Sequence, residues 1–427
     1  MAETVATVVA QGLCTGCGTC LLVCEAGAIR MDESPAGLLR AKVADVCTSC
    51  GKCIQVCPGS TVDFGLDADT DPFKGNVRGA FIGHAQHPAV RSGAQSGGVV
   101  SALLMHLLDT SAVDAALTTS LPDDGRLRPV PALARNHQAV LEARGSKYLP
   151  VAANAALCEL PDGERVAAVG VSCHVHGLHR LSQRSPQWAD RIGLTIGLFC
   201  DRSLLYSASE LLANEVDLDP GSLAGLEFRS KARSGWPGEV CFHLSTGGSL
   251  FYPSSIRTRV KDYVTLPRCR VCFDKMNILA DVSVGDPWGF EHSPDGWSVA
   301  LARTDRGLNA LNEAASSGYL VLQEVDPADV FKGQDVGEKA RSFSGFSAAW
   351  TQMGRSLPEF VGVGTLCAPV GADATARYRD QLEFNCRVAE SQSRAMALAV
   401  VRRRRRLVKV RTGLSKVLKK ARGRRAS

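Results

Sequence analysis

Two runs of cysteines with the same spacing lie near the N-terminus. Each run follows the pattern Cys-x2-Cys-x2-Cys-x3-Cys, and Pro58 comes directly after the second. The runs comprise Cys14, Cys17, Cys20 and Cys24, and then Cys47, Cys50, Cys53 and Cys57. This spacing is typical of modules that bind two 4Fe-4S clusters, in which the fourth cysteine of each run binds the cluster of the other run. We therefore expect one cluster on Cys14, Cys17, Cys20 and Cys57, and the second on Cys47, Cys50, Cys53 and Cys24.

A pair of zinc knuckles is the alternative for these cysteines, but zinc knuckles do not need the longer third interval. Gly16, Gly18 and Gly51 suit the tight loops that wrap a cluster. Glu25 stands where ferredoxin runs often carry proline, and this change removes no ligand. The sequence thus predicts a ferredoxin-like module. Because such clusters carry single electrons, the rest of the chain should hold a two-electron centre.

A further set of cysteines is expected at the ends of strands in the body of the chain. Cys173 and Cys200 each follow an apolar run and precede a helical pattern, and Cys269-x2-Cys272 follows Pro267. Ligands collect at the carboxyl ends of strands in open α/β sheets. These four thiolates could hold a third 4Fe-4S cluster or a structural zinc ion, and the neighbouring ferredoxin module favours the cluster.

The other four cysteines have no partner at ligand spacing, and we expect them to be buried free thiols. They are Cys158, Cys241, Cys367 and Cys386.

A glycine-rich segment, residues 91–104, follows one predicted strand and begins a helix. Ser96, Gly97 and Gly98 at this helix start could present hydroxyl and amide groups to a phosphate, although a plain packing turn is equally compatible. The spacing fits neither the dinucleotide fingerprint nor the P-loop. Lys147, in the turn at residues 145–148, could serve the same anion or lie in an ordinary solvated loop.

Other polar residues are weaker candidates. Arg229 and Lys231 lie beside an aromatic residue, and Asp286 follows a short apolar strand; each could equally be a solvated strand end. The histidines after Cys173 could supply a proton donor, but a packed or surface position is the simpler interpretation. They are His174, His176 and His179.

Alternating strand and helix patterns predict an α/β body. Expected strands are residues 80–84, 115–119, 166–171, 192–199, 226–229, 282–285 and 299–302. Expected helices are residues 97–108, 174–183, 204–214 and 308–317, whereas residues 221–252 look antiparallel. The predicted domains are the two-cluster α+β module 1–65, a linker, the body in two parts, 76–160 and 161–345, and an extension 346–427 with a basic tail from residue 402.

Composition and charge exclude several classes of protein. The 427 residues are 45% hydrophobic and 22% charged, as in ordinary folded chains. The net charge of +6 is misleading, because residues 402–427 hold a dense run of Lys and Arg and no acid, and the remainder is acidic on balance. Neither a secretory signal nor a spanning segment is recognised, so we expect a cytoplasmic protein with thiols reduced.

The basic tail has two open interpretations. Its apolar residues recur at partly helical spacing, which suits an amphipathic helix at the inner, anionic face of a membrane; a solvated, partly disordered tail is equally compatible. Those apolar residues are Leu407, Val410, Leu414, Val417 and Leu418. Nucleic-acid binding is disfavoured because residues 400–427 contain no aromatic side chain for base stacking.

Together the motifs resemble the beta-subunit family of coenzyme F420-reducing hydrogenases and F420-linked dehydrogenases, from about Cys14 to about Gly345. The motifs are the ferredoxin module, residues 96–104, 145–148, 170–173, 197–200 and 228–231, and Cys269-x2-Cys272 leading to residues 280–286. Chlorophyll-pigment reductases are similar to the same family. Ser172 and His174 depart from the residues that relatives usually carry, which leaves the ligand Cys173 in place but puts the substrate side in question.

The resemblance implies an FAD-binding body with a third 4Fe-4S cluster beside the flavin. It implies Cys173, Cys200, Cys269 and Cys272 as cluster ligands, Ser96, Gly97, Gly98 and Lys147 as FAD contacts, and Arg229, Lys231 and Asp286 as flavin or substrate contacts. The implied function is an oxidoreductase that uses coenzyme F420 or ferredoxin to reduce an organic substrate. The alternative is a non-catalytic electron-input subunit that delivers electrons to a partner reductase.

Overall fold

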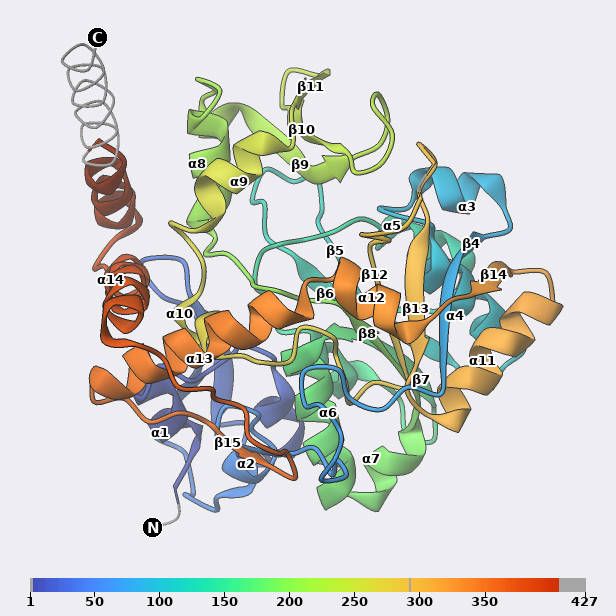
Figure 1. The fold of residues 1–427 in the computed structure, drawn as a ribbon, viewed down its shortest axis with the longest axis horizontal. Coiled ribbons are helices and arrows are strands. Elements are labelled where there is room, and N and C mark those ends of the chain that lie inside the picture. The colour runs from blue at the N-terminus through green and yellow to red at the C-terminus, as the bar shows by residue number, and fades with distance from the viewer. Residues whose placement is uncertain (1–2, 292, 407–427) are drawn as a thin grey trace, which may run out of the picture.

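The body is built on one mixed eight-stranded sheet (Figure 1). The computed structural model describes residues 3–291 and 293–406. The strand order is β14-β4-β13-β12-β8-β7-β5-β6. The strands are β4 (Gly79–Ala85), β5 (Ala115–Ser120), β6 (Val130–Ala134), β7 (Val166–Val171), β8 (Ile192–Leu198), β12 (Val282–Gly285), β13 (Ser298–Ala302) and β14 (Leu320–Glu324). The centre, β12-β8-β7-β5, is parallel, and the outer pairs are antiparallel.

Both faces of this sheet are covered, which explains why its central strands are apolar throughout. On β7, Ala167 faces the apolar cluster beneath α4 and α11, whereas Val166 and Ala168 face the cluster beneath α6. The covering helices are α3 (Pro88–Gly93), α4 (Val99–Asp109), α5 (His137–Glu142), η2 (Ala153–Glu159), α6 (Ser172–Arg184), α7 (Pro186–Arg191), α11 (Asp305–Ser316) and α12 (Pro327–Gly333). The expected α/β body is therefore confirmed, and the expected strands are all present with small shifts of their ends.

A second sheet lies at one end of the body, at the top of Figure 1. It is antiparallel, as expected for this stretch, and pairs β9 (Leu223–Ser230), β10 (Glu239–Leu244) and β11 (Ser249–Tyr252). One face packs on α8 (Ser207–Asn214) and α9 (Ser255–Lys261) through Val240 and Phe242 of β10. The short turn η3 (Pro220–Ser222) precedes β9.

The N-terminal module is small and mostly loop, because the cysteine runs leave little room for regular structure. It consists of α1 (Val5–Ala10), η1 (Thr19–Val23), β1 (Ile29–Glu33), β2 (Leu39–Val43), α2 (Lys52–Gln55) and β3 (Thr61–Asp63). Strands β1 and β2 form an antiparallel hairpin. Gly18 and Gly51 precede η1 and α2 with φ of 87° and 75°, a conformation that glycine adopts without strain.

The C-terminal extension packs against the N-terminal module, as the blue and orange-red segments of Figure 1 show. It contains α13 (Val336–Gln352), β15 (Glu359–Val361) and α14 (Ala372–Ala389), and β15 pairs in parallel with β3. Trp350 and Leu382 share an apolar cluster with Val5 and Val8. The expected boundary at residue 345 falls inside α13, which spans the end of the body and the start of the extension.

The beginning of the basic tail is folded onto the body. Residues 394–406 are helical, and Val401 is fully buried in the cluster beneath β9 and β10. Arg404 pairs with Asp380 and Arg405 with Glu215. The expected amphipathic pattern from Leu407 onward lies outside the described residues. Within the described residues, no helix is both long and apolar enough to cross a membrane.

Candidate functional site

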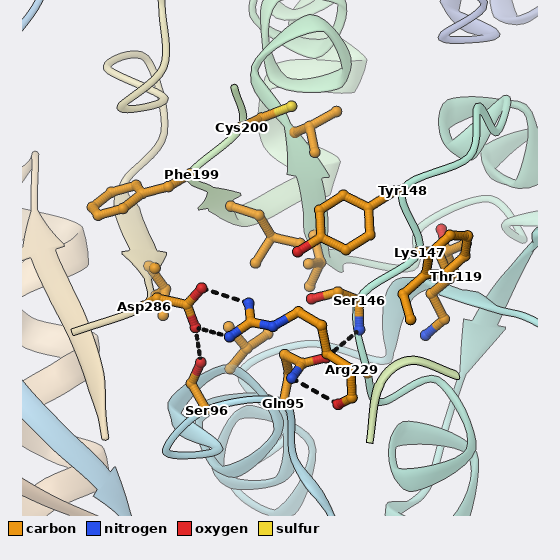
Figure 2. A pocket seen from close by; sticks show the side chains of 18 of the residues that line it. Gln95, Ser96, Thr119, Ser146, Lys147, Tyr148, Phe199, Cys200, Arg229 and Asp286 are labelled. Carbon is orange, nitrogen blue, oxygen red and sulfur yellow. Dashed lines mark hydrogen bonds and ion pairs between the residues drawn. The ribbon is translucent and has the colours of Figure 1, made fainter. Parts of the chain in front are cut away.

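A cavity of about 580 Å³ lies at the carboxyl ends of the parallel strands, between the two sheets. Its lining draws on α4, the turn at residues 145–148, the segment after β8, and β9. Of the residues expected to contact a cofactor, it includes Ser96, Gly98, Lys147, Arg229 and Asp286. The structure thus brings together residues from four distant segments, as Figure 2 shows.

Asp286 is the centre of a hydrogen-bond network in this cavity (Figure 2). It accepts hydrogen bonds from both terminal nitrogens of Arg229, at 2.5 and 3.1 Å, from Ser96 Oγ, and from Trp236 Nε1 at 3.2 Å. Burial by itself would raise the pKa of Asp286, but the Arg229 charge and the hydrogen bonds from Arg229, Ser96 and Trp236 together hold this pKa below its usual value. Asp286 is therefore a fixed anion at neutral pH, and it holds the Arg229 guanidinium in one orientation.

Two of the expected contacts do not line the cavity. Gly97 packs into the sheet, where a Cβ atom would lie 2.5 Å from Gly83 O and 2.7 Å from Ser298 N. Lys231 donates from Nζ to the carbonyls of Arg91, Ser96 and Asp295 at 2.6 to 2.8 Å. Gly97 and Lys231 therefore position the loop that carries Ser96.

Lys147 does line the cavity, and its amine loses its proton more readily than that of an ordinary lysine. Its Nζ donates to the carbonyls of Ala143 and Arg144, but burial lowers the pKa of Lys147 to about 7. A bound anion would favour the protonated form of this amine.

The lining is strongly cationic. Seven basic and only two acidic residues line it. Besides Lys147 and Arg229, the basic residues are Arg144, Arg202, Arg257, Lys261 and Lys275. Arg257 Nε is buried without a hydrogen-bond partner among the described residues. Sequence reasoning missed these five cations. Of these five, only Arg202 could have been suspected from the sequence, because it comes just after the end of a predicted strand.

The four body cysteines lie together beside this cavity. Cys173 begins α6 just after β7, Cys200 follows β8, and Cys269 belongs to α10 (Pro267–Arg270) with Cys272 just beyond it. Burial raises the pKa of Cys173 well above its usual value, and the thiols of Cys17, Cys200, Cys269 and Cys272 raise it further. Cys200 also lines the cavity. Such poorly solvated thiols are suited to binding iron, whose positive charge offsets the cost of forming thiolates.

The spacing of these sulfur atoms is wider than that of a zinc site. Tetrahedral zinc holds sulfur ligands about 3.8 Å apart, from Zn–S bonds of about 2.3 Å. Among the described residues, three possible ligand atoms lie within 4.8 Å of one another in the group Glu227, Cys241 and His243. The body cysteines do not meet this criterion, so no three of their sulfur atoms lie that close together. A four-iron cluster is larger than a single ion, so the donor set fits it better.

The N-terminal cysteines form a path from the surface to the body. Burial raises the pKa of Cys57, and Cys17 and Cys14 raise it further, so the structure brings the last cysteine of the second run to the first run. Within the second set, Cys24 directly follows η1, which packs on α2, and α2 carries Cys53. Cys50 is exposed, whereas Cys17 is close enough to the body thiol Cys173 to raise the pKa of Cys173.

Hydrogen bonds join the N-terminal module to the body next to Cys17. Asn154 donates from its backbone amide to Cys17 O at 3.0 Å and from Nδ2 to Thr19 Oγ1 at 2.8 Å and His174 O at 3.0 Å. Thr19 Oγ1 in turn lies 3.3 Å from Cys17 Sγ. These contacts keep one ferredoxin cysteine close to the body group.

The histidines near Cys173 are packed, in agreement with the simpler interpretation. His174 lies 3.0 Å from Val151 O, and burial lowers the pKa of His174 to about 4, which leaves it neutral. His176 Nε2 lies 2.7 Å from Asp274 Oδ2 in the interior. His179 contacts Gln183.

The expectation of buried free thiols is only half right. Cys241 and Cys386 are buried, but Cys158 and Cys367 are exposed. Cys158 lies at the end of η2, and Cys367 lies in the irregular segment between β15 and α14, where neighbouring side chains do not cover it.

A dicluster module joined to a cavity-bearing α/β body defines an iron–sulfur electron-transfer protein. Two family descriptions match the body, one for each half of the coenzyme F420 hydrogenase/dehydrogenase beta subunit. The description of the N-terminal half matches residues 80–158, and that of the C-terminal half matches residues 163–328. Together they cover more than half of the chain, and a 4Fe-4S dicluster domain matches residues 13–61. The chain belongs to the coenzyme F420 hydrogenase/dehydrogenase beta-subunit family, so the resemblance inferred from the motifs is confirmed.

Relatives of this chain act in different enzymes. It is 26% identical over 336 residues to a coenzyme F420-dependent sulfite reductase of Methanocaldococcus jannaschii, covering 75% of this chain but only 48% of that protein. It is 24% identical over 267 residues to the coenzyme F420 hydrogenase subunit beta of Methanosarcina barkeri, covering 60% of this chain and 86% of that relative. A rice 7-hydroxymethyl chlorophyll a reductase is 29% identical over 211 residues, covering 45% of this chain and 40% of that protein.

The fold also matches a solved structure. A chain of the F420-reducing [NiFe] hydrogenase complex of Methanosarcina barkeri superposes with a TM-score of 0.52 at 21% identity, covering 68% of this chain and 98% of that chain. The beta-subunit fold of the body is therefore shown.

Proposed function

We propose that this chain is an FAD- and iron–sulfur-dependent oxidoreductase. In this proposal, reduced coenzyme F420 or ferredoxin supplies electrons, FAD occupies the cavity, and three 4Fe-4S clusters carry single electrons. The product is a reduced organic substrate. The observation that carries the proposal is the position of Cys200, which both lines the cationic cavity and belongs to the four-cysteine group next to Cys17.

The cavity is suited to a large anionic ligand. Its volume of about 580 Å³ falls within the range of cofactor sites, and its excess of basic side chains suits a pyrophosphate. Ser96 and Lys147 would hold the phosphates. Arg229, oriented by Asp286, and Arg257, with its unpaired Nε, remain as further donors.

Bound FAD would convert between hydride transfer and single-electron transfer. The chain's own part is to orient the ligand and to hold the four body cysteines, which would bind the third cluster, next to the cavity. Neutral His174 adds no charge between the cavity and Cys173. The Asn154 contacts hold Cys17 next to that group, so electrons could continue toward the exposed Cys50.

The second candidate is an electron-input subunit that passes electrons from reduced coenzyme F420 to a separate reductase. The names of the relatives favour it, since one of them is a hydrogenase subunit. The chain also matches less than half of the sulfite reductase, which leaves room for another catalytic part there.

The test begins with anaerobic purification of the full chain. We expect about twelve iron atoms and about one FAD per chain. Reduced F420 or reduced ferredoxin, added separately, should bleach the flavin absorbance. About eight iron atoms without flavin, or no bleaching by either donor, would overturn the proposal. Reduction of an organic acceptor by the isolated chain would distinguish the enzyme from the input subunit.

A further inference from the structure

Three metal-binding side chains meet on the second sheet, away from the cysteine groups described above. Glu227 lies on β9, and Cys241 and His243 lie on β10. Cys241 is the cross-strand partner of Glu227, and His243 Nε2 lies 3.1 Å from Glu227 Oε1. One potential ligand atom from each residue lies within 4.8 Å of the other two.

The surroundings of Cys241 are unusual for a buried free thiol. Cys241 is fully buried, yet it belongs to none of the apolar clusters, because its neighbours Val240 and Phe242 point into the core instead. Burial raises the pKa of Cys241 to about 11, with further contributions from Glu227, Asp123 and Glu239. The thiol is therefore surrounded by carboxylates.

The basic partner of Glu227 is His243 itself. In the part of the chain that the structure describes, no Lys or Arg forms an ion pair with Glu227 or Asp123. Glu239 Oε2 is buried and has no hydrogen-bond partner there. Asp123 lies against Gly225, the cross-strand partner of His243. Among the described residues, these carboxylates thus form no ion pair with a lysine or arginine, and His243 is the basic side chain that contacts them.

A neighbouring residue already orients His243 for ligation. Its Nδ1 lies 2.8 Å from Ser249 Oγ on the adjacent strand β11. Metal-binding histidines commonly use their second ring nitrogen in this way, which fixes the ring and leaves the other nitrogen for the metal.

We propose that Glu227, Cys241 and His243 bind a divalent cation of the zinc class. A thiolate, an imidazole and a carboxylate form a donor set that suits zinc, and three protein ligands leave a fourth position for water or for the Asp123 carboxylate. The ion would link β9 to β10. Since β9 continues into Phe228 and Arg229, both in the cavity lining, the ion would also stiffen that wall.

The test measures zinc and iron in the full, cluster-loaded chain. Anaerobically purified protein is equilibrated with zinc, passed over a weak chelating resin and analysed for both metals. We expect about one zinc ion per chain, with one sulfur ligand in the zinc X-ray absorption spectrum. Cys241→Ala and His243→Ala should lose this zinc with the iron content unchanged. Ser249→Ala should weaken zinc affinity about 10- to 100-fold.

His137→Ala is the matched control, because His137 pairs with Asp109 at 2.9 Å on the surface without a cysteine nearby; it should retain the zinc. If a variant loses iron as well, Glu227→Gln replaces it as the milder change. Zinc that persists in both Cys241→Ala and His243→Ala would belong to the cluster cysteines. That result, or a wild-type chain without retained zinc, would overturn the proposal.

Discussion

At the scale of single residues, Asp286 and Arg229 are the most tightly constrained charges of the cavity. Their side chains are only 17% and 5% exposed, and each depends on the other for compensation. A pair of this kind has a small net effect on stability when intact, but the loss of one partner leaves a buried, uncompensated charge.

Arg229→Ala should therefore destabilise the chain by about 3 to 5 kcal/mol, because Asp286 keeps only Ser96 and Trp236 as partners. The measurement is the midpoint of thermal unfolding without added cofactor. Arg341→Ala is the control, since Arg341 pairs with Glu338 on the surface, where loss of a pair costs about 1 kcal/mol or less. Equal shifts in the two variants would contradict the expected role of burial.

Lys147 allows a prediction about pH. Its pKa falls to about 7 in the folded chain, from an ordinary value of 10.5. Between these values the unfolded chain binds more protons, so the free energy of unfolding should rise with pH. Between pH 7 and pH 9, we expect the free energy of unfolding of the wild type to rise by about 2 kcal/mol more than that of Lys147→Met. Denaturant titration of both proteins measures this difference, and parallel pH profiles would refute it.

At the scale of elements, α6 connects the cysteine group of the body with the N-terminal module. It carries Cys173 at its start, and Gly177 on the same helix lies against Thr19 of the N-terminal module. A Cβ atom on Gly177 would be placed 2.1 Å from Thr19 Oγ1, a distance that the module could accommodate only by moving.

Gly177→Ala should lower the thermal midpoint and slow electron exchange between the module and the body. In a helix interior, alanine is normally more stable than glycine by about 1 kcal/mol. A loss of stability in Gly177→Ala would therefore come from the contact with Thr19. Gly337→Ala in α13 is the control, because the nearest atom to its added Cβ, Arg341 Nη1, is 3.5 Å away. Stopped-flow reduction of the clusters would measure the exchange. An unchanged rate together with an unchanged midpoint would show that the junction tolerates the methyl group.

At the scale of the whole molecule, the cysteine groups are arranged from the surface to the cavity. Cys50 is exposed, and Val46, which precedes Cys47, is 66% exposed. Cys17 is close enough to Cys173 to raise its pKa, and Cys200 lines the cavity. The C-terminal helices α13 and α14 cover the module and hold it against the body.

Cys50→Ala should remove the cluster nearest the surface and leave about eight of about twelve iron atoms. Under the proposed function, reduction by an external one-electron donor should then slow strongly, whereas exchange of hydride at the cavity should continue. Iron analysis and anaerobic kinetics with each type of donor test this expectation. Retention of fast one-electron reduction would mean that electrons enter elsewhere. Cys158→Ala, an exposed cysteine outside the groups, is the matched control.

The sequence by itself determined the local chemistry of this protein. The cysteine spacing predicted the ferredoxin module, which the dicluster match at residues 13–61 confirms, and the apolar runs predicted the α/β body and the antiparallel stretch before residue 252. These features depend on short-range periodicity, so neighbouring residues suffice to reveal them.

Only the tertiary structure decided which residues share a site. It placed Gly97 and Lys231 behind the cavity, brought Arg257 and Lys275 into its lining, and exposed Cys158. The physical reason is that burial and charge compensation depend on segments far apart in the chain, which meet only when the sheets and helices pack.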